Sequence, residues 1–350
     1  MSVVLGRLRQ RAGKLRNAWY RRPRLALVSS AQLREYRQTA RGIKTYRQHQ
    51  LEGKHTFLLR RNVHMIEKGL TMRPRRATFA AEYIVETVDA TIRLFSDIDA
   101  PLDEAEREWI SSVLADYFNA TAESDHDNIA SARTAYQSFV QQQSSVPALG
   151  PHLHDLSTPA VKVDDLLALA QNRRSARWFR DETVGRDHVD RAVAIALESP
   201  TACNRQPYRF EIFDDRDAIK RVAEIPMGTA GYSDQLVGLV VVVGRLSAFF
   251  DERDRHLIYI DSSLATMSLV LGLEAQGIAS CIINWPDIAE RDAKIRKVIN
   301  IDADERVVMM VAYGYPDNEA LVPYSQKGSV DATRTYNSIR AQKVKRGNGR

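Results

Sequence analysis

Three arginines and one serine fall within five residues of this 350-residue chain. The run reads Arg173-Arg174-Ser175-Ala176-Arg177 and follows a segment with helical periodicity. Guanidinium groups present forked N–H donors that match phosphate and carboxylate oxygens, and a hydroxyl adds another donor. The pattern favours a site for a phosphate or another anionic group, while a solvated arginine cluster has the same composition.

A second polar segment covers residues 199–210. A predicted helix stops before Pro200, and a loop with Asn204 and Gln206 leads into a strand. Carboxamides both donate and accept hydrogen bonds, which suits the edge of a heterocycle. A third segment, residues 272–281, predicts the end of a helix and the start of a strand that continues to Trp285.

Side-chain nucleophiles and metal ligands have no recognisable pattern in the sequence. It contains no G-x-S-x-G, no H-E-x-x-H and no P-loop. His64 and Glu67 are three residues apart on a predicted helix, a spacing typical of a structural pair. Cys203 is interpreted as a small packed residue. We therefore expect neither a catalytic side chain nor a metal site.

The elements that must position these residues follow from hydrophobic periodicity. From residue 160 onward it predicts helices at residues 164–172, 187–198, 217–224, 254–276 and 289–299. Strands are predicted at residues 209–213, 236–243, 280–285 and 307–313. The fold class is therefore α+β, with a central mixed sheet and flanking helices.

The first half of the chain predicts helices only. Apolar side chains gather on helical faces within residues 79–95, 109–118 and 129–140. We expect an all-α module to precede the α+β domain. The predicted divisions are a basic arm (1–50), the helical module (51–145), a linker (146–160), the α+β domain (161–335) and a basic tail (336–350).

Charge is distributed unevenly along the chain. The net charge is +6, but residues 1–50 contain 13 Lys and Arg and one acidic residue, Glu35. The remaining residues are therefore net acidic, which argues against a nucleic-acid partner. Apolar residues make up 44% and charged residues 27%, an ordinary globular composition. Two cysteines cannot form a disulfide framework, so we expect a cytoplasmic protein.

The first 23 residues predict a basic amphipathic helix that ends at Pro23. Its apolar residues recur at steps of three and four: Val4, Leu8, Ala12, Leu15 and Trp19. Such a helix suits an anionic membrane surface, here the inner face of the membrane. A helix docked on its own protein or on a second copy, and a frayed tail, remain as alternatives.

The order of the polar segments resembles the FMN-dependent nitroreductase family. The family's opening motif corresponds to residues 173–179, and its "SPSxxNxQPWxF" element corresponds to residues 199–210, with Tyr208 in place of Trp. A helix-to-strand element corresponds to residues 271–280, and the closing "GYP" to residues 314–316. The resemblance covers about residues 160–330.

This resemblance implies a homodimer that binds FMN at the subunit interface. The residues implied to hold the phosphate, ribityl chain and pyrimidine edge are Arg173, Arg174, Ser175 and Arg177. Those implied to reach the flavin of the partner subunit are Pro200, Thr201, Ala202 and Asn204. Those implied to pack along the ring are Ile283, Asn284 and Trp285. Lys327 is implied near the phosphate, and Gly231 is also carried over.

The resemblance also implies the reaction. NAD(P)H would donate a hydride to flavin N5, and the electrons would then pass to a small organic acceptor. An alternative from another class is a membrane-peripheral accessory protein, linked to polysaccharide biosynthesis, with a structural flavin domain. A flavin spectrum that bleaches under NAD(P)H would distinguish the two.

Overall fold

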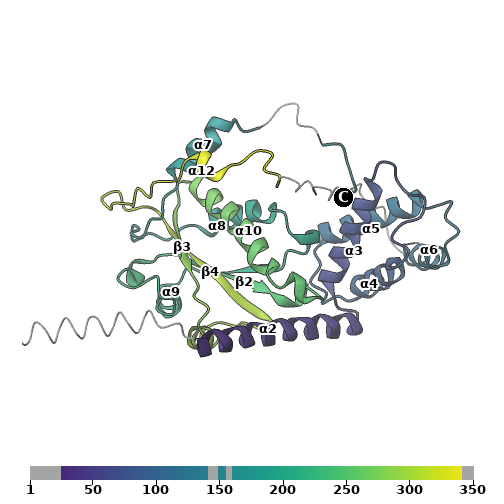
Figure 1. Ribbon diagram of the computed structural model, residues 1–350, viewed down its shortest axis with the longest axis horizontal. Helices are drawn as coiled ribbons and strands as arrows, with labels where there is room; N and C mark the ends of the chain where they lie inside the picture. Colours follow the sequence, from purple (N-terminus) through teal and green to yellow (C-terminus); the bar gives the residue numbers. More distant parts are fainter. Residues whose placement is uncertain (1–24, 141–148, 155–159, 341–350) are drawn as a thin grey trace, which may run out of the picture.

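The computed structural model describes residues 25–140, 149–154 and 160–340. Figure 1 shows helices gathered at one end and a sheet with its own helices at the other. The first part contains α2 (Leu25–Glu52), α3 (Thr56–Leu70), α4 (Ile84–Ser96), α5 (Glu104–Ala120) and α6 (Asp127–Val140). The amphipathic helix expected at residues 1–23 lies outside the described residues.

A core of its own holds the helical part together. Buried side chains from α3, α4, α5 and α6 pack in one cluster, with Leu59, Ile84, Leu114 and Ile129 at its centre. The turn before α5 is closed by a capping box, in which Asp103 and Glu106 each accept from the other's backbone N–H. Burial of these apolar faces is the main source of helix stability here.

The second part is built on a four-stranded sheet. Its strands are β1 (Tyr208–Phe213), β2 (Leu239–Arg245), β3 (Ala279–Asn284) and β4 (Glu305–Gly314). They pair in the order β1-β2-β4-β3, and every neighbouring pair is antiparallel. A parallel bridge joins Ser175 to Ser280 at the edge. The predicted α+β class, with an all-α part before it, is confirmed. The expected mixed pairing is not found among the four strands, and the parallel contact within the described residues is the Ser175–Ser280 bridge.

Both faces of the sheet are covered because β2 is apolar on both sides. Leu239, Val241 and Val243 enter one core, and Val240 and Val242 enter the other. Helices α9 (Arg216–Ala223) and α11 (Ala289–Ile295) cover the first face. Helices α8 (Arg186–Leu197) and α10 (Leu257–Glu274) cover the second. Two further helices are α7 (Val163–Asn172) and α12 (Val330–Thr333).

Helix α2 connects the two parts. It runs along one edge of the molecule beneath both the sheet and the helical part (Figure 1). Arg34 donates to Asp287 Oδ1 at 2.9 Å, whereas Tyr46, three turns later, packs against His55. A Cβ at Gly42 would lie 2.5 Å from Leu246 Cβ, so this close approach requires glycine. The second half of the expected basic arm is thus a packed helix.

One helix of the described residues has the length and hydropathy of a membrane span. Residues Glu252–Glu274 have a mean hydropathy of 1.4, and half of that window is buried inside the protein. The segment contains α10, which packs against α8 and against the sheet. This packing is typical of the central helix of a globular domain.

Candidate functional site

The basic segment lies where α7 meets the edge of the sheet. Arg173 is the C-cap of α7, and the chain then runs beside β3, where Ala176 N donates to Ser280 O at 3.1 Å. Further along, Arg180 N donates to Tyr315 O at 2.9 Å. The segment is therefore held by backbone bonds between the start of β3 and the end of β4.

The cations of this segment have no acidic ion-pair partner within the described ranges. None of Arg173, Arg174 and Arg177 forms a salt bridge there. The Arg174 guanidinium donates to the carbonyl oxygen of the preceding residue, Arg173, at 2.9 Å. Burial raises the pKa of Glu274, against the opposing effect of Arg173 and Arg174. The segment is thus a cluster of positive charge with Glu274 as an acidic neighbour but with no salt bridge among the described residues.

A buried thiol lies behind the cluster. Cys281 is 2% exposed, and the side chains of Ser175 and Tyr232 are within hydrogen-bonding reach of it. Burial raises the pKa of the Cys281 thiol, although Arg177 opposes this shift. A neutral buried thiol is a poor nucleophile. Ser175 therefore anchors the segment to β3 as well as offering a hydroxyl.

Open space lies beside Arg177. Its Cζ is 5.9 Å from the centroid of the Tyr232 ring. The preceding residue, Gly231, has a φ of +91°, and a Cβ built there would meet no atom within 4 Å. A positive φ with free space on that side permits close approach of a ligand to the backbone.

The second polar segment forms a tight loop between α8 and β1. A short 3-10 helix spans Ala202–Asn204, and Ala202 N donates to Asp261 Oδ2 at 3.1 Å. Gln206 Nε2 donates to Asn204 Oδ1 at 3.3 Å, so the two carboxamides bind each other. Cys203, Asn204 and Gln206 have φ of 54°, 51° and 50°. Three non-glycine residues in the left-handed region indicate a strained loop, a frequent feature of ligand sites.

Arg205 was not singled out by the sequence because arginine is usually exposed. It is 3% exposed, donates to Ala202 O at 3.0 Å, and has its Cζ 5.1 Å from the centroid of Phe249. Burial lowers the pKa of this guanidinium. The sequence analysis also did not single out Asp261, although an acidic residue within a largely apolar helix is a signal that could have indicated it. Both residues hold the loop in place.

The two polar segments lie at opposite ends of α10. Arg173 and Arg174 act on the pKa of Glu274, the last residue of α10, whereas the loop is bonded to Asp261, in its first turns. At 1.5 Å per residue these two positions are about 20 Å apart along the axis. The start of the second segment lies between these positions, since Ser199 Oγ donates to Ser268 Oγ at 2.7 Å, so only the loop at residues 202–206 is placed at the far end of α10.

The site residues predicted on β3 and just after it differ in burial. Ile283 and Trp285 are buried in a core cluster, and Trp285 Nε1 donates to Asp292 Oδ1 at 2.9 Å. The exposed side chains are Ile282 and Asn284. Strand side chains alternate, so Ile283 and Trp285 lie on the core side of this copy, and the packing of Ile283, Asn284 and Trp285 along a ring stays a prediction. Lys327 is exposed in the C-terminal segment.

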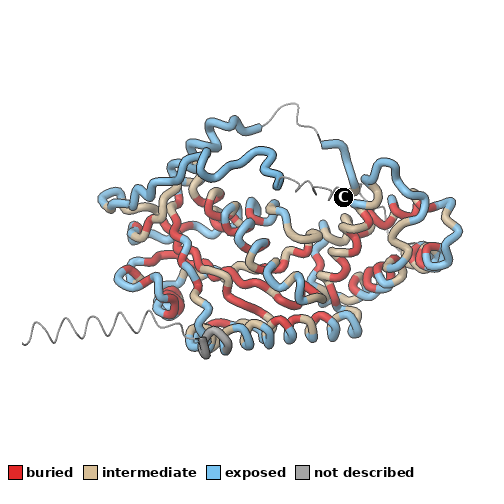
Figure 2. The backbone as a smooth tube through the Cα atoms, viewed as in Figure 1, coloured by how far each residue is buried: buried red, intermediate tan, exposed pale blue. Residues whose placement is uncertain are grey.

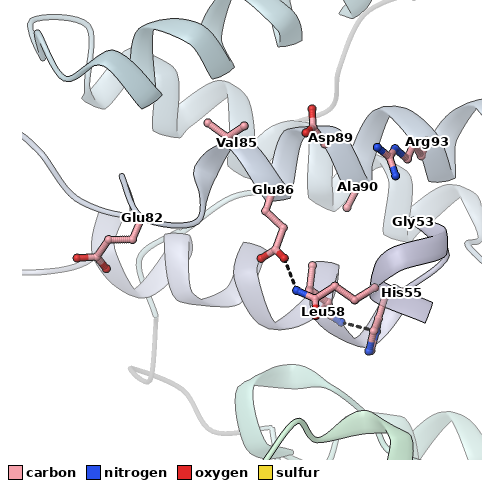
Figure 3. A pocket seen from close by; sticks show the side chains of 10 residues that line it. Gly53, His55, Leu58, Glu82, Val85, Glu86, Asp89, Ala90 and Arg93 are labelled. Atoms are coloured by element: carbon pink, nitrogen blue, oxygen red, sulfur yellow. Dashed lines mark hydrogen bonds between the residues drawn. The ribbon is translucent and has the colours of Figure 1, made fainter. Parts of the chain in front are cut away.

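The described residues hold no group of three or more His, Cys, Asp and Glu arranged to bind a metal ion. A separate cavity of about 400 Å³ lies in the helical part (Figure 3). Its wall includes Glu86, which accepts from Gln50, and His55, whose Nδ1 accepts from Leu58 N. Burial lowers the pKa of His55 to about 3. None of the predicted site residues lines this cavity.

The model of the Nitroreductase family matches residues 170–243 and 237–315. An Archaeoglobus fulgidus protein, whose name proposes an NADH dehydrogenase/NAD(P)H nitroreductase, is 25% identical over 158 residues, or 45% of this chain and 88% of that protein. Iodotyrosine deiodinase of Thermotoga neapolitana is 28% identical over 193 residues, 46% of this chain and 97% of the relative.

Two further matches extend the comparison. Human iodotyrosine deiodinase 1 is 22% identical over 255 residues, covering 64% of this chain and 84% of the relative. Among solved structures, an FMN-dependent nitroreductase from Clostridium difficile is 19% identical, with a TM-score of 0.39, and it matches 51% of this chain and 99% of its own. The family-model match spans both polar segments and all four strands. The C-terminal domain of this chain therefore belongs to the nitroreductase family.

Proposed function

We propose that the C-terminal domain, bounded as predicted at residues 161–335, is an FMN-dependent oxidoreductase. Electrons would enter from NAD(P)H and leave to a small organic acceptor. The observation that carries the proposal is the cluster of three arginines beside β3, which form no salt bridge among the described residues, within a nitroreductase-family domain. At the family level a flavin-type oxidoreductase follows from the match, and the donor and acceptor are our proposal.

The donor set fits the cofactor. Arg173, Arg174 and Arg177 offer charge-assisted donors that form no salt bridge among the described residues, which suits a phosphate and an anionic ring edge. Free space at Gly231 supports approach of a flat group beside Arg177. Bound FMN would supply hydride chemistry, and the protein would supply binding and electrostatics. Lys327 would add a cation near the phosphate.

A second copy of the chain would complete the site. Exposed apolar side chains follow one stripe of α10 at Ile260, Leu264 and Met267, and α7 buries none of its residues. An apolar surface that spans neighbouring helices marks a protein interface. We propose a homodimer in which Pro200, Thr201, Ala202 and Asn204 of one copy approach the arginine cluster of the other.

Anaerobic titration tests this function. The purified full chain, reconstituted with FMN, should show a flavin spectrum that bleaches when NADH or NADPH is added and returns when a nitroaromatic acceptor follows. A chain that binds FMN but is never bleached by either nucleotide contradicts the proposed electron donor. A chain that binds no FMN favours the alternative of an accessory protein at the inner face of the membrane.

A second acceptor class is favoured by the iodotyrosine deiodinases among the relatives. The Thermotoga neapolitana deiodinase is 28% identical to this chain, and the Archaeoglobus protein is 25% identical. We therefore propose a halogenated phenol as the second candidate acceptor. The same reduced protein should be mixed with 3-iodotyrosine in parallel with the nitroaromatic. Iodide release would favour dehalogenation, and release below the rate of free reduced FMN would exclude it.

A further inference from the structure

Helix α2 has two faces with different charge environments. On the inner face every charged residue has a partner: Arg34 donates to Asp287, and Glu35 lies 3.7 Å from Arg255. Gln38 on the same side accepts from Arg306. These bonds fix the helix to the body at one rotation about its axis. The outer face is therefore presented in a defined orientation.

The outer face carries a continuous basic stripe. Its cations are Arg37, Arg41, Lys44 and Arg47, all exposed and spaced by four, three and three residues. Within the described ranges none of the four forms a salt bridge. At 100° per residue they fall within about a third of the helix circumference, along about 15 Å of its length. Figure 2 shows exposed positions along this outer side of α2.

Large apolar side chains accompany the cations. Leu33 is 47% exposed, Tyr36 is 65% exposed and Leu51 is 85% exposed. Lys44 follows Leu33 by 11 residues and precedes Leu51 by seven. Both intervals are close to a whole number of helical turns, so the three side chains lie at the centre of the outer face. Exposed leucines that bracket cations on one helix face are unfavourable in water. Insertion into a lipid interface would bury them.

From these observations we propose that the outer face of α2 is a docking surface for an anionic membrane. The cations would lie at the headgroups, and Leu33, Tyr36 and Leu51 would enter the acyl boundary. A nucleic acid would use the cations and leave the leucines exposed, so it fits the surface less well. The surface lies on a helix fixed to the body, so it is distinct from the membrane contact predicted for residues 1–23.

Vesicle sedimentation of the full chain tests the proposal. The probes are phosphatidylcholine vesicles with and without phosphatidylglycerol. We expect binding to the anionic vesicles at low salt, and roughly 100-fold or greater weakening in the variant Arg37→Gln/Arg41→Gln/Lys44→Gln/Arg47→Gln. A matched control removes four exposed cations elsewhere, Lys162→Gln/Arg191→Gln/Arg221→Gln/Lys297→Gln, and should bind nearly as the parent does.

A second variant, Leu33→Ser/Leu51→Ser, separates lipid from other polyanions. It should weaken binding to anionic vesicles by about 10-fold or more and leave binding to duplex RNA unchanged. Circular dichroism checks that each variant keeps its helical content. If the stripe variant and its matched control lose binding to anionic vesicles equally, that result overturns the proposal. So does a chain that binds RNA tightly and ignores anionic vesicles.

Discussion

At the scale of single residues, three cations without an acidic partner define the candidate site. Arg173, Arg174 and Arg177 are held beside β3 by backbone bonds, so their side chains are not needed to keep the segment in place. Ser175 differs from them, because its hydroxyl lies against the buried Cys281 thiol. Replacing the arginines should therefore affect ligand binding more than folding.

The first prediction concerns Arg173 and Ser175. The double variant Arg173→Ala/Ser175→Ala should weaken FMN binding by about 10- to 100-fold per lost contact, because a charge-assisted bond contributes about 1.5–3 kcal/mol. Quenching of FMN fluorescence measures the affinity, and circular dichroism checks the fold. Arg191→Ala, at an exposed position of α8, is the matched control. Unchanged affinity in the double variant would remove this cluster from the cofactor site.

At the scale of elements, one buried carboxylate joins three strands. Glu305 starts β4, is 3% exposed, and accepts from Arg209 of β1 and Arg245 of β2 at 2.9 and 3.1 Å. Burial acts to raise the pKa of Glu305, but Arg209, the backbone N–H of Asp302 and Arg245 together outweigh it, and the pKa is lowered. The charged form is therefore the stabilising one.

Removing this carboxylate should weaken the sheet in a pH-dependent way. Glu305→Ala should lower the free energy of unfolding by about 1.5–3 kcal/mol at pH 7, because two partly exposed guanidiniums lose a buried charged acceptor. A lowered folded pKa means that this stability exists above the unfolded value of about 4.3 and is lost as pH falls through the folded pKa. Urea unfolding at neutral and acid pH measures the free energy of unfolding of the parent and of the variant. If the difference in unfolding free energy between the parent and Glu305→Ala does not shrink in acid, Glu305 is not the stabilising carboxylate.

The strands and the long apolar helix could be predicted because their signals are local. Strand 236–243 was expected from a run of valines and is observed at Leu239–Arg245, and helix 254–276 is observed as α10. The side of β3 that faces the core was not predictable, because Ile282 and Ile283 are both apolar. Burial of Arg205 and the packing of α2 depend on tertiary contacts, which no local pattern contains.

At the scale of the whole molecule, the account requires two copies of the chain. The residues of α10 next to the strained loop and next to the arginine cluster, Asp261 and Glu274, lie about 20 Å apart along the helix axis, and an apolar stripe on α10 is exposed. The domain boundaries remain a prediction. The N-terminal helices provide the outer face of α2, and the nitroreductase-family domain provides the candidate cofactor site.

A charge placed in the apolar stripe should separate the copies. Leu264→Asp should convert a dimer to a monomer and lower FMN affinity by 10-fold or more, because a carboxylate buried in an apolar interface is unfavourable. Light scattering during size-exclusion chromatography measures the mass. Ile98→Asp introduces the same charge at an exposed apolar residue of the helical part and should change neither property. A Leu264→Asp dimer with full FMN affinity would contradict the proposed interface.

The central claim, a cofactor site shared by two copies, is tested most directly by complementation. One chain carries Arg173→Ala/Ser175→Ala and the other carries Asn204→Glu, and each alone should bind little FMN. Unfolding and refolding them together should produce mixed dimers in which one of two sites is intact. The account predicts that FMN binding returns, at about a quarter of the parent's stoichiometry per chain if pairing is random. Mixed dimers that bind no more FMN than either variant alone would contradict it.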